Sequence, residues 1–278
     1  MKGVNMTPAT GTPGTSIHLV DSIGGFQRYT LGRARKRLVL AISGREKTGK
    51  SSLALSAPGP IAYANYDVGL EGVIERHCKH KQIYASQYRV HIPPGMTGRE
   101  QIALKANEVW ERFKKDIRAA YASTVIRSIV VDTETETWEH IRIARFGQLM
   151  QIKPHHYGPV NREYRELFNE VYDTDKNLIL IDRQQDEWEN TPGANGQLEG
   201  RRTGRLERKG MKDIPFMVQA NLLCEYNPAA GSGDKFSVKI VDCRQNMSIA
   251  EAVLPQSACD FMTLAQMVYP GSDESEWV

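Results

Sequence analysis

The sequence predicts an α/β fold with a mostly parallel central sheet flanked by helices and an antiparallel extension at the C-terminal side. Short apolar, β-branched runs alternate with longer segments of helical spacing, an order typical of parallel strands joined by helices. A glycine-rich turn separates the first strand from the first helix. Two later segments of strand character, joined by a short turn, indicate the antiparallel extension.

Length and composition limit the possible classes of protein. The 278 residues, 40% hydrophobic and 25% charged, suit one large domain or two small ones and exclude wholesale disorder. No apolar run approaches the roughly 18 residues of a membrane span, and the N-terminus lacks the apolar segment of a secretory signal. We therefore expect a cytoplasmic protein that does not associate with a membrane. The net charge of +3 is too small to indicate an anionic partner.

The elements follow in order along the chain. Apolar runs predict buried strands at residues 38–43, 61–66, 89–92, 128–131 and 177–181, with later strands at 219–226 and 235–242. Helices are expected at residues 51–56, 70–80, 99–123, from 132 to about 147 and at 161–171. We divide the chain into a flexible leader with a basic flank (1–36), a core domain (37–268) and an acidic C-terminal tail (269–278). The four cysteines form no C-x-x-C pair, which favours reduced, buried thiols.

A phosphate-binding loop is the most specific motif. Residues 44–51 match G-x-x-x-x-G-K-[ST] and lie between a predicted strand and a predicted helix, the context this motif requires. The glycines let the backbone wrap phosphate oxygens, and successive N–H groups point at the anion. Lys50 is expected on the β- and γ-phosphates and Ser51 on Mg²⁺. The predicted nucleotide-binding residues are Gly44, Arg45, Glu46, Lys47, Thr48, Gly49, Lys50, Ser51 and Ser52.

Acidic residues follow two other predicted strands. Asp132 ends an apolar strand, as expected of the acid that fixes the metal shell in a P-loop enzyme. Asp67 ends the strand at 61–66, which we expect beside the strand of the phosphate loop, and is the first candidate to orient the attacking water. A helix N-cap is the structural alternative for Asp67. The other candidates for the water-orienting acid are Glu71, Glu134 and Glu136.

Four segments together resemble the RecA-like core of P-loop ATPases: GREKTGKSS, YANYDVGLEG, SIVVDTETETW and LILIDRQQ. More narrowly, they are similar to phage AAA-type ATP-binding proteins that include single-strand annealing proteins. The resemblance covers about residues 37–242. It implies that the strand at 177–181 lies between the phosphate-loop strand and the Asp132 strand, and that Asp67 matches the catalytic acid.

The resemblance also implies a γ-phosphate sensor after the strand at 177–181. Arg183, Gln184 and Gln185 are the candidates, with Gln184 favoured. The loop that follows is expected to contact single-stranded DNA, and the protein is expected to form a homo-oligomer or filament. A single-strand-binding protein is a further possible partner.

The segment 185–212 shows no periodicity and is predicted to be a long loop. Its second half has six basic residues against Glu207, which favours contacts with a nucleic-acid backbone. A solvated flexible loop and arginine fingers on a neighbouring nucleotide are the alternatives, and a helical turn would place Arg201 and Arg205 on one face. The predicted DNA contacts here are Arg201, Arg202, Arg205, Arg208, Lys209 and Lys212.

Other segments are weaker candidates. Lys153, His155 and His156, with Tyr157, combine charge and stacking surface in residues 151–157, where a plain surface loop or a metal site is the alternative. The basic flank 28–37 suits a solvated segment or a third DNA contact. The segment 273–278 is either a regulatory or partner-binding tail or a frayed terminus. In filament-forming relatives, lysines of a similar late hairpin reach the next subunit's phosphates, which makes Lys235 and Lys239 candidates.

These observations predict an ATP-dependent single-stranded-DNA-binding protein of phage recombination, active in single-strand annealing, that hydrolyses ATP with Mg²⁺. Lys50, Asp67, Asp132 and Gln184 are its expected catalytic residues, and Ser51 and Asp132 its metal residues. A P-loop kinase acting on a small molecule is the second hypothesis. A nucleotide-dependent switch or loader that grips a protein partner is the third.

Overall fold

The computed structural model describes residues 22–23, 26–27, 36–67, 71–91, 98–147, 153–192, 197–231 and 233–277. The chain divides into two units, residues 1–35 and 36–278. In the first unit, β1 (Ser22–Ile23) pairs with β2 (Phe26–Gln27) in antiparallel fashion. The rest of the predicted leader lies outside the described residues. None of the described helices is long and apolar enough to cross a bilayer.

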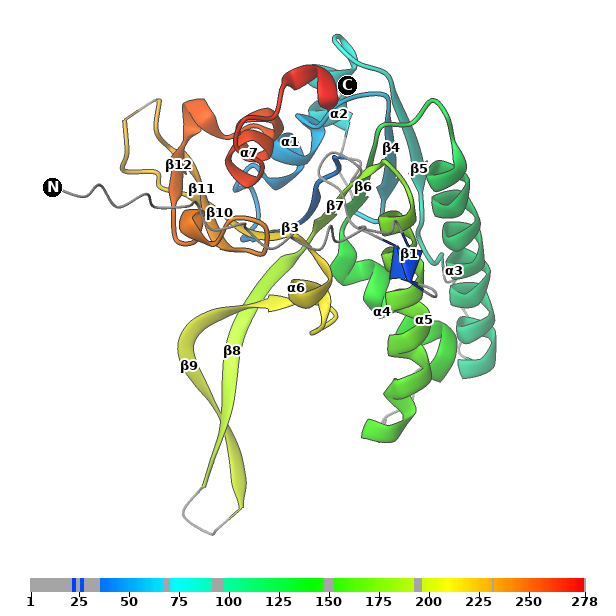
Figure 1. Cartoon of the computed structure of the whole chain (residues 1–278). Helices are drawn as coiled ribbons and strands as arrows, with labels where there is room; N and C mark the ends of the chain where they lie inside the picture. Colours follow the sequence, from blue (N-terminus) through cyan, green and yellow to red (C-terminus); the bar gives the residue numbers. More distant parts are fainter. Residues whose placement is uncertain are drawn as a thin grey trace, which may run out of the picture. The chain divides into compact units, whose positions relative to one another are not determined.

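Among the described residues of the second unit, eight strands form one sheet in the order β12-β11-β10-β3-β7-β6-β4-β5 (Figure 1). The strands from β10 to β5 run parallel, whereas β10, β11 and β12 pair antiparallel. Their bounds are β3 (Val39–Gly44), β4 (Ile61–Asn65), β5 (Ile83–Gln87), β6 (Ser128–Asp132), β7 (Asn177–Ile181), β10 (Ala220–Tyr226), β11 (Phe236–Cys243) and β12 (Val253–Pro255). The predicted fold class is confirmed, and β7 lies between β3 and β6 as the resemblance implies.

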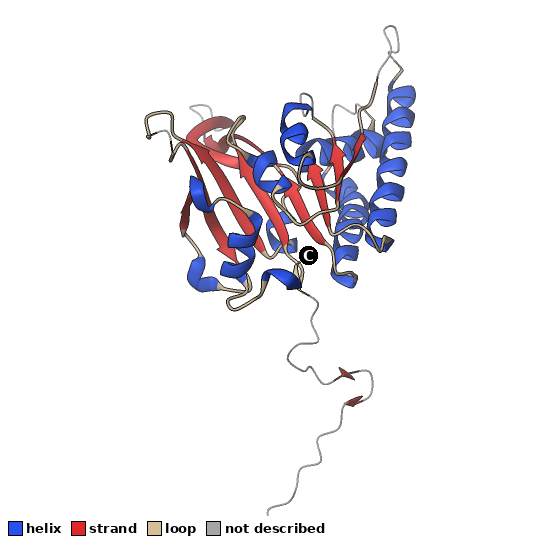
Figure 2. Cartoon of the chain, turned by 90° about the horizontal axis from the view of Figure 1, so that it is seen from above, coloured by secondary structure: helices blue, strands red, loops and turns tan. Residues whose placement is uncertain are grey.

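Helices cover both faces of this sheet (Figure 2). One face packs against α1 (Lys50–Leu55), α2 (Glu71–Cys78) and α7 (Phe261–Val268). The other packs against α3 (Arg99–Ala122), α4 (Glu134–Phe146) and α5 (Tyr157–Asn169). A short helix, α6 (Ile214–Met217), precedes β10. Single 3₁₀ turns include Pro154–His156 before α5 and Glu170–Asp173 after it.

The apolar strands are explained by burial on two sides. In β3, Leu40 and Ile42 face the α1 layer, and Val39 and Ala41 face the α3 layer. Successive side chains point to opposite faces of a strand, so a strand covered on both faces must be apolar throughout. This is why the central strands could be predicted from short apolar runs.

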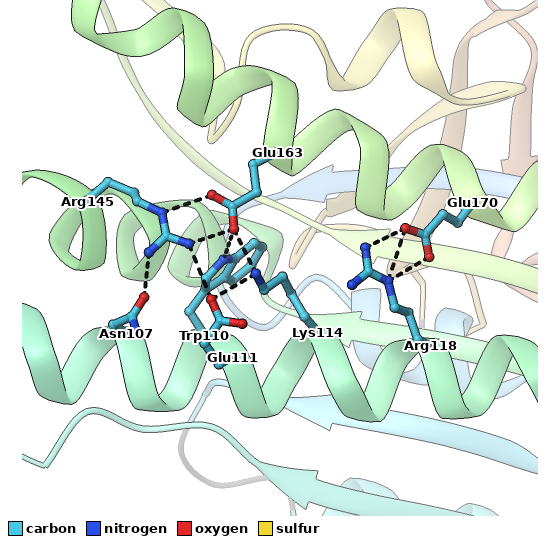
Figure 3. Close-up of polar contacts among 8 residues, drawn as sticks. All are labelled: Asn107, Trp110, Glu111, Lys114, Arg118, Arg145, Glu163 and Glu170. Atoms are coloured by element: carbon cyan, nitrogen blue, oxygen red, sulfur yellow. Dashed lines mark hydrogen bonds and ion pairs between the residues drawn. The ribbon is translucent and has the colours of Figure 1, made fainter.

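The helical layer of α3, α4 and α5 is joined by an aromatic core and a charged network (Figure 3). Glu163 of α5 is the centre of the network. Its Oε1 accepts hydrogen bonds from Trp110 Nε1 at 2.8 Å, Lys114 Nζ at 2.9 Å and Arg145 Nη2 at 2.6 Å. Because these donors come from α3 and α4, one carboxylate connects three helices.

Two predictions about the far side of the sheet are wrong. A strand is expected at 89–92, but the strand in this part of the chain is β5, which ends earlier, at Gln87. Arg89, Val90 and His91 form no strand, and Ile92 lies outside the described residues. β5 is an edge strand with exposed side chains, so it lacks the apolar run of its neighbours. The strand before Asp67 is β4, which is separated from β3 by β7 and β6 rather than lying beside it.

The prediction of a long loop at 185–212 is wrong for most of the described residues of that segment. They belong to a long antiparallel hairpin of β8 (Arg183–Pro192) and β9 (Leu198–Lys209), which extends away from the sheet (Figure 1). Both faces of such a ribbon are exposed to solvent. Its strands are therefore held by backbone pairing, and their sequence lacks the alternation of apolar and polar residues that burial of one face imposes. A bulge lies opposite Glu187, where Gly204 has φ +79°. Arg201 and Arg205 lie on a strand, so the helical turn considered for them is wrong.

The acidic C-terminal segment packs against the core. Trp277 is only 3% exposed, and its ring centroid lies 6.1 Å from Phe261 and 5.7 Å from Tyr269. Asp273 and Glu276 form a capping box around the last turn, and Glu276 pairs with Lys36. A frayed terminus is therefore wrong through residue 277. β12 and α7 are two elements that the sequence did not predict.

Candidate functional site

The phosphate-loop motif connects β3 to α1 at the carboxyl edge of the parallel strands. Gly44 has φ +156°, and a Cβ there would lie 2.6 Å from the Cys224 carbonyl oxygen and 2.8 Å from Thr48 Oγ1. Gly49 caps α1 in the left-handed region at φ +88°. Both positions exclude a larger residue, for crowding in the first case and for backbone conformation in the second. Between them, Arg45, Glu46 and Lys47 are exposed.

Three predicted site residues meet beside this loop. Lys50 Nζ donates to the Gly44 carbonyl at 3.0 Å and also to the Arg45 carbonyl, so it lies over the loop. Ser51 Oγ donates to Asp132 Oδ2 at 2.7 Å, and the buried Tyr63 hydroxyl donates to the same oxygen. A hydroxyl and a carboxylate in contact are the oxygen ligands that Mg²⁺ prefers. The residues therefore fit a triphosphate with its metal ion.

Burial sets the protonation tendencies of the site. It lowers the pKa of Lys50, although the charges of Asp132 and Asp67 oppose that shift. It raises the pKa of Asp132, although hydrogen bonds from Ser51 and Tyr63 oppose the shift. Each charge thus depends on the other groups of the site.

Arg183 joins two of the candidate water-orienting acids. Its Nη2 lies 3.2 Å from Asp67 Oδ1, and its Nη1 contacts Glu136. Glu134 has a different place, because its side chain is completely buried below the first turn of α4. Glu71 begins α2, and its side chain lies outside the described residues. The structure therefore places Asp67 and Glu136, not Glu134, on the accessible side of the site.

The three sensor candidates lie at the start of β8. Gln185 donates to Glu207 Oε1 across the hairpin at 2.7 Å. Gln184 is paired in register with Arg208. Within the described part of the chain, Arg183 is the sensor candidate that contacts Asp67 and Glu136, a link that sequence reasoning did not find. Gln184 as the sensor stays a prediction.

A buried charged cluster anchors the hairpin to the sheet. Arg208 Nη1 lies 2.9 Å from Asp182 Oδ2 and 3.4 Å from Glu134 Oε2, and Tyr164 donates to Glu134 at 2.9 Å. Burial, together with the charge of Asp182, raises the pKa of Glu134. Arg208 is thus held inside the protein rather than presented as the predicted DNA contact. The signal for Asp182, a carboxylate directly after an apolar strand, was present and was missed.

A second contact fixes both strands of the hairpin to α4. Thr135 Oγ1 accepts a hydrogen bond from Arg183 N at 3.0 Å and donates to the Lys209 carbonyl at 2.6 Å. One hydroxyl therefore ties the start of β8 and the end of β9 to the helix that follows Asp132.

The remaining predicted DNA contacts lie on the surface. Arg201, Arg202, Arg205 and Lys209 are exposed on β9, and Lys212 follows it. Sequence reasoning missed Trp188 of β8, which is 56% exposed and has the Arg202 guanidinium 5.1 Å from its ring centroid. Lys153, His155 and His156 are exposed before α5, a separate element.

The other candidate segments take part in local contacts. Arg37 of the basic flank donates to the Thr174 carbonyl at 2.7 Å, and Lys36 pairs with Glu276, whereas residues 28–35 lie outside the described residues. On β11, Lys239 pairs with Glu251 at 2.5 Å. Lys235 is half-buried just before that strand.

Comparison with known families agrees with this site. Residues 36–242, well over half of the chain, match the AAA domain family, and the chain belongs to it. The fold and the site thus define an AAA-type P-loop ATPase, a nucleotide-dependent class of enzyme. No curated protein matches the chain.

Proposed function

We propose that this ATPase binds single-stranded DNA in an ATP-dependent manner and acts in phage homologous recombination by single-strand annealing. Its place of action would be the cytoplasm of the host cell. The proposal combines the nucleotide site with the basic hairpin that begins beside it.

At the nucleotide site, each group has a defined task. Lys50 balances charge on the β- and γ-phosphates, and the Ser51–Asp132 pair holds Mg²⁺. When bound, Mg²⁺ supplies positive charge that offsets the charge developing on the phosphates. Asp67 orients the water, since Asp67 is at the edge of the site and 41% of its side chain is exposed.

The observation that carries the proposal is the position of Arg183. This residue is the first of β8 and pairs with Asp67, so the hairpin starts within the acidic side of the nucleotide site. A γ-phosphate that competes for Arg183 would change the contacts at the hairpin's base. This supports coupling between ATP and the surface that β8 and β9 present.

The composition of the hairpin supports single-stranded DNA as its ligand. Arg201, Arg202 and Arg205 supply positive charge, and Trp188 offers a ring on which a base can stack. Charge combined with exposed aromatic rings is typical of proteins that bind single strands. Lys153, His155 and His156 would extend this surface, and Lys209 and Lys212 lie at its base.

We also propose that the protein self-associates, with Lys235 and Lys239 reaching a neighbouring subunit's nucleotide, and that a single-strand-binding protein is a partner. The switch hypothesis loses its main support, because the Trp277 ring that would dock on a protein partner is buried in the core.

The first test is fluorescence anisotropy with a labelled single-stranded oligonucleotide, with and without ATP and Mg²⁺, across a series of salt concentrations. Wild type should bind more tightly with ATP, and Lys50→Ala should lose that gain. The double variant Arg201→Gln/Arg205→Gln should weaken binding and reduce the slope of log K against log salt by about 1.4, because each lost phosphate contact removes about 0.7.

The matched control is Lys105→Gln/Lys115→Gln, which removes two exposed charges from α3. It should leave binding and the salt slope unchanged. Equal losses in both double variants would indicate a general charge effect. Absence of DNA binding under every condition, with a phosphorylated small molecule formed instead, would overturn the proposal in favour of a P-loop kinase.

A further inference from the structure

Two aromatic side chains lie together at the tip of the antiparallel extension. Tyr226 ends β10 and Phe236 begins β11, and their ring centroids are 5.0 Å apart at an interplanar angle of 43°. Tyr226 is 44% exposed. The pair therefore presents aromatic surface to solvent at one end of the sheet.

This aromatic pair adjoins the phosphate loop. Cys224 of β10 is paired with Gly44 of β3, so Tyr226 lies two residues beyond that pair at the same carboxyl edge. Phe236 Cδ1 lies 3.5 Å from the position that a Cβ on Gly49 would occupy. The Phe236 ring is thus within contact distance of the residue that caps α1.

The sheet order defines which part of a nucleotide would reach this pair. Asp132 and Asp67 follow β6 and β4 on one side of β3, whereas β10 and β11 lie on its other side. With the γ-phosphate directed toward the acids, the sugar and the base extend from the loop in the opposite direction. That direction leads to Tyr226 and Phe236.

The backbone at Phe236 is held in place independently of any ligand. Gln256 Oε1 accepts hydrogen bonds from Lys235 N at 3.1 Å and from Phe236 N at 3.3 Å. Asn227 N donates to the Lys235 carbonyl at 2.8 Å, which closes the ladder just beyond Tyr226. A ring on a fixed backbone loses little freedom when a ligand stacks on it.

We propose that Tyr226 and Phe236 form the stacking site for the base of the nucleotide whose phosphates lie in the 44–51 loop. The inference rests on the proposed nucleotide binding and adds the residues that contact its base. A stacking surface responds to ring size rather than to a pattern of donors and acceptors. Purine nucleotides should therefore bind more tightly than pyrimidine nucleotides.

The test compares equilibrium binding of MgATP, MgUTP and magnesium tripolyphosphate, which has phosphates but no base, by titration calorimetry. Wild type should bind MgATP most tightly. Phe236→Ala and Tyr226→Ala should each weaken MgATP binding roughly tenfold, in keeping with the loss of one base stack, and should leave tripolyphosphate binding unchanged. Phe236→Tyr should retain most of the MgATP affinity.

The controls separate the possible failures. Phe216→Ala removes an exposed aromatic ring from α6 and should change neither affinity. Phe236→Ala and Tyr226→Ala could weaken the binding of MgATP and of tripolyphosphate equally, or could leave the binding of both unchanged. Either result would show that the stacking site is wrong while nucleotide binding stands. If wild type binds none of the three ligands, the proposed function itself fails. Tyr226→Ala alters an exposed side chain, so it provides a readout even if Phe236→Ala disturbs β11.

Discussion

At the scale of single residues, Arg183 has the most connected position in the site. It pairs with Asp67, which follows β4, and with Glu136 of α4, while its backbone N–H donates to Thr135 Oγ1. A charged side chain shared in this way can transmit a change at one partner to the others. We expect Arg183 to act between ATP and the hairpin rather than on either alone.

Arg183→Gln removes the guanidinium charge and shortens the side chain but keeps its end polar. ATP should still bind through the 44–51 loop, but the increase in DNA affinity that ATP produces should fall to about a tenth of the wild-type factor or less, an energy change of ~1.4 kcal/mol. Anisotropy with and without ATP measures this ratio. Asn190→Ala, exposed farther along the same strand, is the control and should keep the ratio. A normal ratio in Arg183→Gln would remove Arg183 from the coupling.

At the scale of elements, the hairpin depends on a buried charged anchor. Arg208 stands between two carboxyl groups of fully buried residues, Glu134 and Asp182. Gly210 is required beside them, because a Cβ there would lie 2.1 Å from Glu134 Oε2. The ribbon thus extends into solvent from a base whose charged groups are buried in the protein.

Arg208→Met should destabilise the protein by about 3–5 kcal/mol, because it leaves two buried carboxyl groups without their positive partner. Adding Glu134→Gln and Asp182→Asn should restore most of the loss. Urea unfolding measures both effects. Arg201→Gln, exposed on the same strand, should stay within about 0.5 kcal/mol of wild type. A small effect of Arg208→Met would show that the base is held by Thr135 and strand pairing instead.

The helical layer offers a pH test at Glu163. Burial raises the pKa of Glu163, but hydrogen bonds from Arg145, Trp110 and Lys114 outweigh it and hold the pKa at about 2. The unfolded chain returns to 4.5, so the stabilisation is complete above pH 4.5 and is lost as the pH falls toward 2.

Glu163→Gln should therefore lower the free energy of unfolding by about 2 kcal/mol at neutral pH. The difference from wild type should shrink as the pH drops below 4.5. Glu139→Gln is the control, because Glu139 is 46% exposed in a pair with Arg142 and should contribute under about 0.5 kcal/mol. A difference that does not vary with pH would mean that the network acts through packing alone.

At the scale of the whole molecule, the C-terminal segment completes the layer formed by α1, α2 and α7. Trp277 is part of that buried cluster, in contact with Phe261 of α7 and Tyr269 after it. The acidic residues around it form the capping box and the Lys36 pair at the surface. The segment thus has a structural role in the fold.

Trp277→Ala should destabilise the second unit by about 3–5 kcal/mol, the usual cost of removing a buried tryptophan ring. Thermal unfolding gives the measurement. Trp188→Ala, which removes an exposed ring, serves for comparison and should change the melting temperature little. Comparable melting temperatures for the two variants would contradict the burial of Trp277.

Much of the central fold and the core of the site can be predicted from the residues alone. The apolar runs of β3, β6 and β7 must be buried on both faces, and the spacing of Gly44, Gly49 and Lys50 specifies a phosphate loop. Both signals are local, since each lies within a few residues of chain. The place of β7 between β3 and β6 came from the resemblance to RecA-like proteins, not from a local pattern.

The contacts that connect the site to the rest of the molecule have no local signal. Arg183 meets Asp67 across 116 positions of the chain, Arg208 meets Glu134 across 74, and Trp277 reaches its cluster from the far end. The hairpin forms by pairing between strands that are exposed to solvent, so its sequence shows no periodic pattern of apolar residues. Local chemistry therefore determined the phosphate loop and the central strands. Only the packing of distant segments decided which acids face Arg183, which arginine is buried, and that β8 and β9 pair as a ribbon.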